Sequence, residues 1–368
     1  IRVSHPQRFK KATYFLSFLK ENASTTTITD IKVADDRTIY VCGKTVKADG
    51  DTAGLLAKFN SDGRLLWQRT LFPTVPASGA KSLEWKALYV ENSNPHNIYV
   101  VGETVPNSVN LTHNPDVVVA KYRSGFDNAN NPDGIIQWQR DIAGISGATR
   151  RDYAASIALD QDGRVMIGGY TDANSLAPDD MWVALLDIDG TIMEKRKIAS
   201  ESGSEHLVDL QWKSTDTFMF IGISDPAGAS DIILGETYYD TATVELQWAK
   251  KIESGAYKFM HPTFTIDEYG AVYVAATAVN AQDKNYGVLY VKFDNNDYTT
   301  PVEHKIYVPT GTYDGCHNAG IKFDVFGNID LGVSVTRAFN DVQSTTLKIS
   351  WNSGNIISAS SASESSGI

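Results

Sequence analysis

The sequence predicts an all-β protein built from repeated four-stranded sheets, and three observations support this fold class. Short apolar runs of four to seven residues are rich in Val, Ile, Tyr, Phe and Thr, and they end at turns that contain Gly or Asp. No window of the 368 residues carries a long apolar stripe of helical period, so we expect almost no helix. One unit of strands and turns also recurs along the chain, which is typical of a repeat architecture.

Each repeat contains the same elements in the same order. In the first copy, a short strand at 31–33 is followed by a strand at 39–43 that ends in a small residue. A polar loop leads to an apolar strand at 55–59, and a tight turn leads to a last strand that ends at Trp67. The turn contains Asp62-Gly63, a pair that supplies the positive φ needed in tight hairpins.

Two independent markers set the register of the repeats. The small residue that closes the second strand recurs at steps of 53 to 67 residues, at Gly43, Gly102, Gly169, Gly222, Ala276 and finally Val333. The Trp position of the fourth strand recurs at steps of 54 to 71 residues, at Trp67, Trp138, Met193, Trp248, His304 and Ser358. Because the two markers have nearly the same period, the sequence predicts six repeats.

Six antiparallel sheets can bury their faces if each stacks on the next around a common axis, and this predicts a β-propeller. We expect small residues where second strands lie near that crowded axis. The predicted propeller spans residues 26–358, with six complete four-stranded blades. The N-terminal segment, residues 1–25, carries an extra strand at 13–19. That strand either closes the ring or belongs to a seventh blade completed by upstream sequence, and the Ser-rich residues 359–368 are predicted to be a tail.

Composition restricts the functional classes. The 33 basic and 44 acidic residues give a net charge of −11, which argues against a nucleic-acid partner or an anionic membrane surface. No apolar run approaches the roughly 18 residues of a membrane span, so we expect no membrane insertion. The chain begins at Ile1 rather than Met, so we expect a piece of a longer protein. Its two cysteines, Cys42 on a strand and Cys316 in a loop, are expected to be packing residues.

Four carboxylates, at Asp51, Asp116, Asp180 and Asp231, each precede a third strand on loops that we expect to share one face. A ring of carboxylates could bind a cation, but the favoured interpretation is that these residues cap turns through side-chain hydrogen bonds. The run Asp187–Gly190 is similar to the start of a calcium loop. Ile198 occupies the position where that loop needs a Glu, so we interpret the run as a hairpin.

Histidine and cysteine spacing indicates no zinc motif among the seven histidines. His206, His261 and His317 recur just before first strands, and a metal or substrate site there is the less favoured alternative. The sequence also contains no nucleophile elbow, phosphate loop or dinucleotide fingerprint. We therefore assign no catalytic residue, no metal ligand and no cofactor, although two carboxylates that meet only in space stay an open possibility.

The second repeat carries the clearest insertions, at 104–115 and 123–134, and insertions on a rigid scaffold often contact partners. The candidate binding residues in the second insertion are Asn128, Asn130 and Asn131, with Asp116, Asp180 and Asp231 as further candidates. A merely tolerated insertion explains the same sequence equally well. The recurring Trp side chains could stack on sugars, but their fixed place on fourth strands favours packing between sheets.

The repeat resembles those of known β-propellers. The segments 39–45 and 56–67 resemble the β-propeller repeat of bacterial secreted and surface proteins. The segment 136–140 is similar to blades in structural proteins of tailed bacteriophages, particularly marine ones. This resemblance implies a non-enzymatic structural or recognition domain of a larger virion protein (tail, fibre or baseplate) or of a cell-surface protein.

The implied partners are other virion or surface-assembly proteins and a cell-surface glycan, with oligomerisation through the parent protein and a location in the virion or at the cell surface. A Trp after an Asp-Gly turn also resembles blades of quinoprotein dehydrogenases. A carbohydrate-active or quinone-dependent propeller enzyme is therefore the alternative, although nothing in the sequence matches the cofactor site or adjacent cysteine pair of the quinoproteins.

Overall fold

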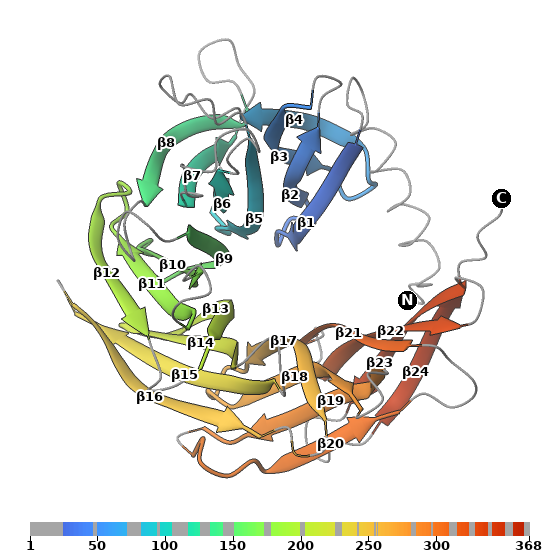
Figure 1. The fold of residues 1–368 in the computed structure, drawn as a ribbon. Helices are drawn as coiled ribbons and strands as arrows, with labels where there is room; N and C mark the ends of the chain where they lie inside the picture. The colour runs from blue at the N-terminus through green and yellow to red at the C-terminus, as the bar shows by residue number, and fades with distance from the viewer. Residues whose placement is uncertain are drawn as a thin grey trace. The chain divides into compact units, whose positions relative to one another are not determined.

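A computed structural model shows an all-β chain (Figure 1). It describes residues 25–46, 50–71, 82–93, 96–104, 117–125, 133–142, 151–172, 178–198, 203–224, 230–240, 243–253, 255, 257–280, 285–295, 297–308, 315–323, 328–337, 341–349 and 356–363. These residues form 24 strands and no helix, as expected from the sequence. Within the same part of the chain, no helix is long and apolar enough to cross a membrane.

The strands form six antiparallel four-stranded sheets, each made of four consecutive strands paired in chain order. The first three sheets contain β1(Thr25–Val33), β2(Ile39–Val46), β3(Thr52–Phe59), β4(Leu65–Leu71), β5(Leu83–Val90), β6(His96–Thr104), β7(Val117–Ser124), β8(Ile135–Ile142), β9(Arg151–Leu159), β10(Val165–Asp172), β11(Asp180–Leu186) and β12(Ile192–Ile198). The last three contain β13(Glu205–Ser214), β14(Thr217–Ser224), β15(Asp231–Tyr239), β16(Val244–Ile252), β17(Lys258–Ile266), β18(Val272–Val279), β19(Asn285–Phe293), β20(Glu303–Tyr307), β21(Gly315–Phe323), β22(Ile329–Arg337), β23(Asp341–Ile349) and β24(Ile356–Ser363). This confirms the predicted β-propeller repeat of six four-stranded blades.

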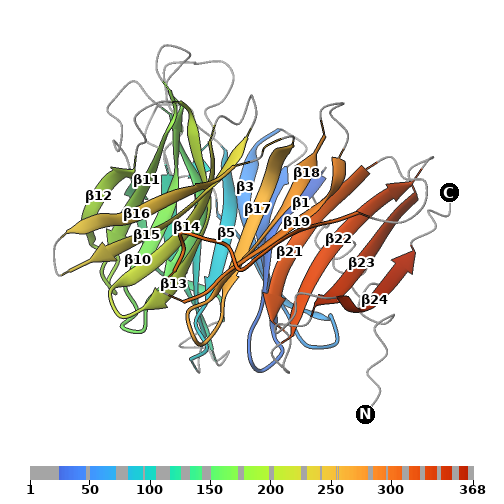
Figure 2. The same cartoon turned by 90° about the horizontal axis from the view of Figure 1, so that it is seen from below.

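The chain divides into two compact units, one made of Ile1–Ser200 with Asp240–Val244 and the other of Glu201–Tyr239 with Glu245–Ile368. In the first unit, β5 packs against β1, β2 and β3, and β9 packs against β5, β6 and β7. In the second unit, β17 packs against β13, β14 and β15, and β21 packs against β17, β18 and β19. Within each unit, the first strand of a sheet therefore covers the face of the sheet before it. Figure 2 shows the four strands of the last sheet, β21 to β24, side by side.

The hydrophobic cores lie between consecutive sheets. One core joins Cys42 and Leu56 of the first sheet to Trp85 of the second, and another joins Val119 of the second sheet to Trp182 of the third. The middle strands are buried on both faces, whereas outer strands such as β8 alternate between half-buried and exposed residues. This difference explains why second and third strands read as continuous apolar runs while fourth strands carry Gln, Arg and Lys.

A β-bulge in the first strand explains the glycine that marks each early repeat. The pairing of β1 with β2 skips Thr29, and the pairing of β5 with β6 skips Lys86. A Cβ on Gly43 would lie 2.0 Å from the backbone oxygen of Thr27, and a Cβ on Gly102 would lie 2.1 Å from that of Glu84. We expected these small residues to accommodate a crowded axis. The close neighbour is instead the bulged first strand of the same sheet.

The hairpin turns between strands are stabilised by one recurring side-chain cap. Asp187 Oδ1 accepts hydrogen bonds from the backbone N–H of Asp189 (3.0 Å) and of Thr191 (2.6 Å). Asn60, Asp160 and Asp267 make the same two bonds, to the residues two and four positions later. Gly190 follows with a φ of 78°. The interpretation of Asp187–Gly190 as a hairpin is therefore confirmed.

Two boundaries differ from the prediction. Strand β24 continues to Ser363, so residues 359–363 of the predicted tail pair with β23 in the sixth sheet. Small Ser and Ala residues can form an outer strand because the pairing uses backbone groups alone. Cys316 was expected in a loop but is the second residue of β21, where it is buried. The predicted N-terminal strand at 13–19 lies outside the described residues.

Candidate functional site

The Trp residues of the fourth strands hold neighbouring sheets together. A Cβ on Gly134, in the β7–β8 turn, would lie 3.1 Å from the indole of Trp67. A Cβ on Gly190, in the β11–β12 turn, would lie 2.7 Å from the indole of Trp138. In the second unit, Trp248 stacks on Tyr298 at 4.8 Å between ring centroids. These contacts confirm that the Trp residues pack on the turn of the next sheet.

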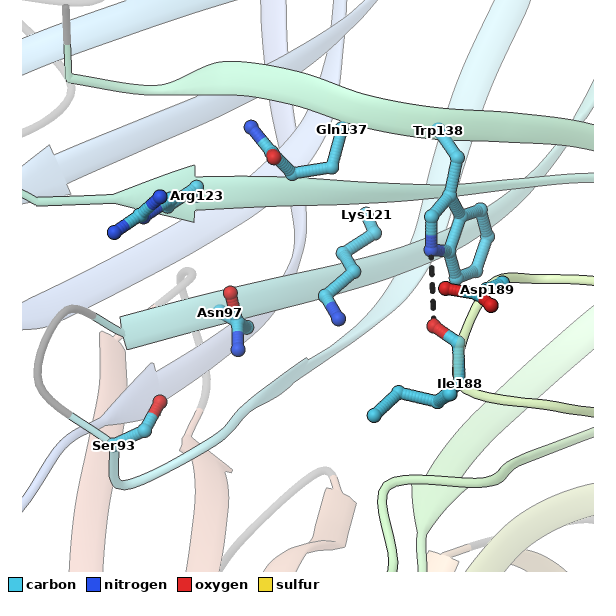
Figure 3. Close-up of a pocket in the computed structure, with 8 residues that line it drawn as sticks. All are labelled: Ser93, Asn97, Lys121, Arg123, Gln137, Trp138, Ile188 and Asp189. Atoms are coloured by element: carbon cyan, nitrogen blue, oxygen red, sulfur yellow. Dashed lines mark hydrogen bonds between the residues drawn. The ribbon is translucent and has the colours of Figure 1, made fainter. Parts of the chain in front are cut away.

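In the first two sheets, an arginine two residues after the Trp completes the contact. Arg140 lies over the ring of Trp138, 5.6 Å from its centroid, and donates a hydrogen bond to the backbone oxygen of Asp189 (2.8 Å). Arg69 lies over Trp67 in the same way, 5.5 Å from its centroid, and donates to the backbone oxygen of Asp133. Trp138 Nε1 also donates to the backbone oxygen of Ile188 at 3.3 Å (Figure 3). The Trp-x-Arg pattern, which sequence reasoning missed, is therefore a docking element.

Beside the Trp138 contact lies a hollow of about 550 Å³, which we call the rim hollow (Figure 3). This volume is within the range of small-molecule binding sites. The rim hollow is lined by Ser93, Asn97, Lys121, Arg123, Gln137, Trp138, Ile188 and Asp189. The second sheet supplies most of this lining, and the β11–β12 turn of the third sheet supplies the rest.

Two cationic side chains, Lys121 and Arg123, come from alternate positions of β7 and therefore share one face of the strand. Figure 3 shows the Lys121 ammonium between Asn97 and the turn at Ile188 and Asp189. Lys121 Nζ lies 5.0 Å from the centroid of the Tyr99 ring. Burial lowers the pKa of Lys121, although the carboxylates of Glu91 and Asp189 act against this change. The geometry thus places a partly desolvated ammonium in an open hollow.

Polar and apolar groups surround these cations. Asn97 Nδ2 donates to Glu91 Oε2 at 2.7 Å, which fixes the orientation of the amide. Gln137 is exposed on β8 and lies at the end of the hollow away from the Trp138 ring (Figure 3). Among the described residues, Asp189 is the one carboxylate that lines the hollow. The lining therefore combines charge, amides and an apolar wall, which suits binding of a polar ligand.

Two further hollows each contain a lysine in an ion pair. A hollow of about 380 Å³ lies between the first and second sheets. In it, Lys58 Nζ donates to Ser124 Oγ (2.7 Å) and contacts Asp133 Oδ2 (3.3 Å), and His96 Nε2 contacts Asp36 Oδ2 at 3.1 Å. In the second unit, a hollow of about 580 Å³ contains Lys213, whose Nζ contacts Glu236 Oε2 at 2.6 Å. Lys250 also lines the larger of these two hollows, where its Nζ lies 5.6 Å from the centroid of the Phe293 ring.

A separate charge cluster of Lys44, Glu84, Lys86 and Glu103 occupies the paired ends of β5 and β6. Glu84 and Glu103 face each other directly across the two strands, an arrangement that destabilises a sheet. The bulge turns Lys86 so that its Nζ contacts Glu84 at 3.2 Å and Glu103 at 2.7 Å. The two contacting oxygens are therefore no more than 5.9 Å apart.

Glu103 is the most buried member of this cluster. Its side chain is 6% exposed, and its second oxygen is buried without a hydrogen-bond partner. Burial raises the pKa of Glu103 in spite of the attraction of Lys86. Lys86 itself has a raised pKa because the two carboxylates outweigh its own desolvation. The cluster is a charge-compensated network in which Lys86 bridges both carboxylates and Lys44 contacts Glu84 alone.

The structure describes only some of the predicted binding residues. Asp180 begins β11 and forms an ion pair with Lys197, and Asp231 begins β15 opposite Ser224. Asp116, Asn128, Asn130 and Asn131 lie outside the described residues. In the described part of the chain, no group of three His, Cys, Asp or Glu side chains could hold a metal ion.

Sequence reasoning missed Lys121 and Arg123. The available signal was a pair of cations at alternate positions in a third strand whose neighbours are apolar. The chemistry of the site depends on which side chains of the third sheet lie nearby, and strand periodicity alone does not report that.

Comparison with known proteins gives the fold. No family model and no curated protein sequence matches the chain. An ulvan lyase from a polysaccharide lyase family is similar in structure, with a TM-score of 0.52 and 10% identity over 89% of this chain and 83% of the lyase. The α-L-arabinofuranosidase Arb93A from Fusarium graminearum has a TM-score of 0.50 and 7% identity over 86% of this chain and 91% of that enzyme.

The β-propeller domain of the trilobed protease from Pyrococcus furiosus is also similar, with a TM-score of 0.44 and 8% identity over 90% of this chain and 91% of that domain. Against a microbial sialidase, variants of an apocarotenoid oxygenase from Synechocystis and a lignostilbene dioxygenase from Pseudomonas brassicacearum, the chain spans 63–65% of the matched protein's length. At 7% and 10% identity, the similarity to the arabinofuranosidase and the ulvan lyase shows a shared fold and carries no activity over to this chain.

Proposed function

We propose that this β-propeller is a non-enzymatic recognition domain and that the rim hollow is where it binds. The observation that carries the proposal is the composition of the hollow. Lys121, Arg123, Asn97 and Gln137 offer binding groups on the strands of one sheet, and Asp189 is the one carboxylate in the described lining. Hydrolysis of a glycosidic bond ordinarily needs a pair of carboxyl groups on either side of the bond, so this site suits binding better than turnover.

The proposal includes a larger parent protein in a virion or at a cell surface. Its support is the resemblance of the repeat at 56–67 and 136–140 to blades of phage structural proteins and bacterial surface proteins. In that setting the propeller presents loops to other assembly proteins and to a cell-surface glycan. Oligomerisation then comes from the parent protein.

Binding and turnover assays on one set of polysaccharides test this proposal. We expect the immobilised protein to bind polysaccharide in surface plasmon resonance and to release no shortened saccharide from it. Gln137→Trp, which fills the rim hollow from an exposed position, should abolish this binding. Gln139→Trp is the matched control, because Gln139 is equally exposed on β8 but does not line the hollow. Product release at about 1 s⁻¹ or faster, or equal binding by both variants, would overturn the proposal.

A carbohydrate-active enzyme is the second candidate, and the charge cluster favours it. The contacting oxygens of Glu84 and Glu103 are at most 5.9 Å apart. This upper limit is compatible with the separation of about 5–5.5 Å between the two carboxyl groups of retaining glycosidases. This candidate predicts turnover that Glu103→Gln abolishes and Gln137→Trp does not. An absence of product from every polysaccharide tested would count against it.

A further inference from the structure

The rim hollow carries more positive charge than its surroundings explain. Lys121 and Arg123 have no hydrogen bond or ion pair to a carboxylate among the described residues. Lys58, at the position in the first sheet that corresponds to Lys121, contacts both Ser124 and Asp133. Lys121 and Arg123 therefore place two positive charges side by side in a chain with a net charge of −11.

The corresponding position in the fourth sheet shows how such a charge is satisfied elsewhere. Glu236 occupies it, and Lys213 pairs with Glu236 at 2.6 Å. A partly buried charge without a partner costs stability, because it loses water and gains no compensating contact. The charges of Glu91 and Asp189 only partly offset the desolvation of Lys121, as expected where a ligand supplies a closer anion.

The remaining lining indicates what else the ligand contains. Amide groups of Asn97 and Gln137 can exchange hydrogen bonds with hydroxyl groups, and the side chain of Ile188 supplies an apolar wall. The described lining of the hollow contains two cations, whereas a nucleic acid needs a track of basic residues along its backbone. Hydroxyl groups, an apolar face and one anionic group occur together in acidic sugars.

We propose that the rim hollow binds an acidic saccharide, with Lys121 and Arg123 holding its carboxylate or sulfate group and Asn97 and Gln137 contacting its hydroxyls. This inference rests on the proposed recognition function and specifies its ligand. Carboxylate and sulfate groups share the chemistry that two cations recognise, so the experiment includes both.

Isothermal titration of the whole chain with three oligosaccharides of equal length tests the inference. The three ligands are an oligouronate, a sulfated oligosaccharide and a neutral oligosaccharide. We expect at least one acidic ligand to bind about tenfold more tightly than the neutral one or better. Lys121→Gln and Arg123→Gln should each weaken acidic binding by about tenfold or more, the loss typical of a charge-assisted hydrogen bond.

Lys292→Gln is the matched control, because Lys292 also lies over a cross-strand tyrosine in a third strand but belongs to the other unit. We expect that variant to bind as the unchanged protein does. Thermal unfolding checks that Lys121→Gln is folded, and we expect its stability to be unchanged or higher because a desolvated charge is lost.

Two results would overturn the inference. One is equal affinity for neutral and acidic ligands, and the other is unchanged acidic binding in Lys121→Gln. Neutral binding that Gln137→Trp blocks would retain the recognition function and reject the acidic ligand. Product release in the same experiment would instead reject the recognition function itself. A preference for the oligouronate or for the sulfated oligosaccharide identifies the anionic group that binds. If an acidic peptide binds and neither acidic saccharide does, the inference is also rejected.

Discussion

The backbone of Gly190 lies against the indole of Trp138, so close that a methyl group added to the glycine would lie 2.7 Å from the ring. The first prediction follows from this contact. Gly190→Ala combines a clash with a φ of 78°, and we expect it to lower the free energy of unfolding by about 2–4 kcal/mol. Urea denaturation measures the change.

Gly50→Ala is the control for backbone strain alone. Gly50 has a φ of 88°, and an added Cβ there would meet no atom within 4 Å. We expect that variant to lose only about 1 kcal/mol. Equal losses in the two variants would show that the Trp138 contact adds nothing to stability.

The second prediction concerns Lys86. Lys86→Met removes the cation that bridges Glu84 and Glu103 and leaves only the contact of Lys44 with Glu84, so we expect a loss of about 2–4 kcal/mol at pH 7. The loss should shrink as pH falls, because burial raises the pKa of Glu103 above its usual 4.5 and protonation then removes the repulsion. Denaturant unfolding of both proteins from pH 4 to pH 8 measures this dependence.

Glu103→Gln in the Lys86→Met background provides the control. We expect the double variant to recover part of the lost stability, because one of the two opposed charges is gone. Full additivity of the two substitutions would contradict a direct coupling between Lys86 and Glu103.

The third prediction is the pH dependence of ligand binding at Lys121. Burial lowers the pKa of Lys121 in the free protein, and a bound anion would raise it again. Binding is therefore strongest below the free-protein pKa and weakens as pH rises through it, at a lower pH than an ordinary lysine would give. Glu91 and Asp189 are the carboxylates whose negative charges act on this ammonium.

Lys121→Arg separates this effect from a general loss of structure at high pH. Arginine stays protonated throughout the range, so its binding should persist where that of the lysine protein has weakened. A parallel decline in both proteins would contradict the role assigned to Lys121.

The fourth prediction uses the reactivity of the two cysteines as a measure of unfolding of the strands that contain them. Burial raises the pKa of Cys42, and it raises that of Cys316 to about 12. Neither thiol should react with a disulfide reagent in the folded protein at pH 8, and both should react at once in denaturant. Absorbance of the released chromophore follows the reaction. Rapid labelling of the native protein would contradict the packing of these two strands.

The repeat itself was predictable because its markers have local causes. Gly43 and Gly102 recur at the same place in their repeats because the bulged first strand of the same sheet leaves no room for a Cβ there. Asp62-Gly63 closes a tight turn. The spacing of such residues therefore revealed the register, although the reason assigned to the glycines was wrong. A bulge leaves no mark of its own in the sequence, because the skipped residue is Thr29 in one sheet and Lys86 in the next.

The rim hollow was not predictable for a different reason. Lys58 lies in the run Leu-Ala-Lys-Phe, and Lys121 lies in the similar run Val-Ala-Lys-Tyr. Lys58 contacts a hydroxyl group and a carboxylate, whereas Lys121 has no such contact at a similar distance among the described residues. Ser124 and Asp133 belong to the following sheet, and so do Ile188 and Asp189. The partner of a charged residue thus comes from the neighbouring sheet, whereas the periodicity of the sequence describes each repeat by itself.

The two ends of the β7–β8 connection make it a suitable place to insert a foreign peptide. Gly125 N donates to Asp133 Oδ1 at 3.1 Å and Gly134 N donates to the oxygen of Arg123 at 3.0 Å, so both ends of the connection are clamped together. A foreign peptide grafted between these ends would start and finish at fixed points a short distance apart, whatever its length. Epitope tags or affinity peptides could therefore be installed there while the propeller beneath keeps its packing.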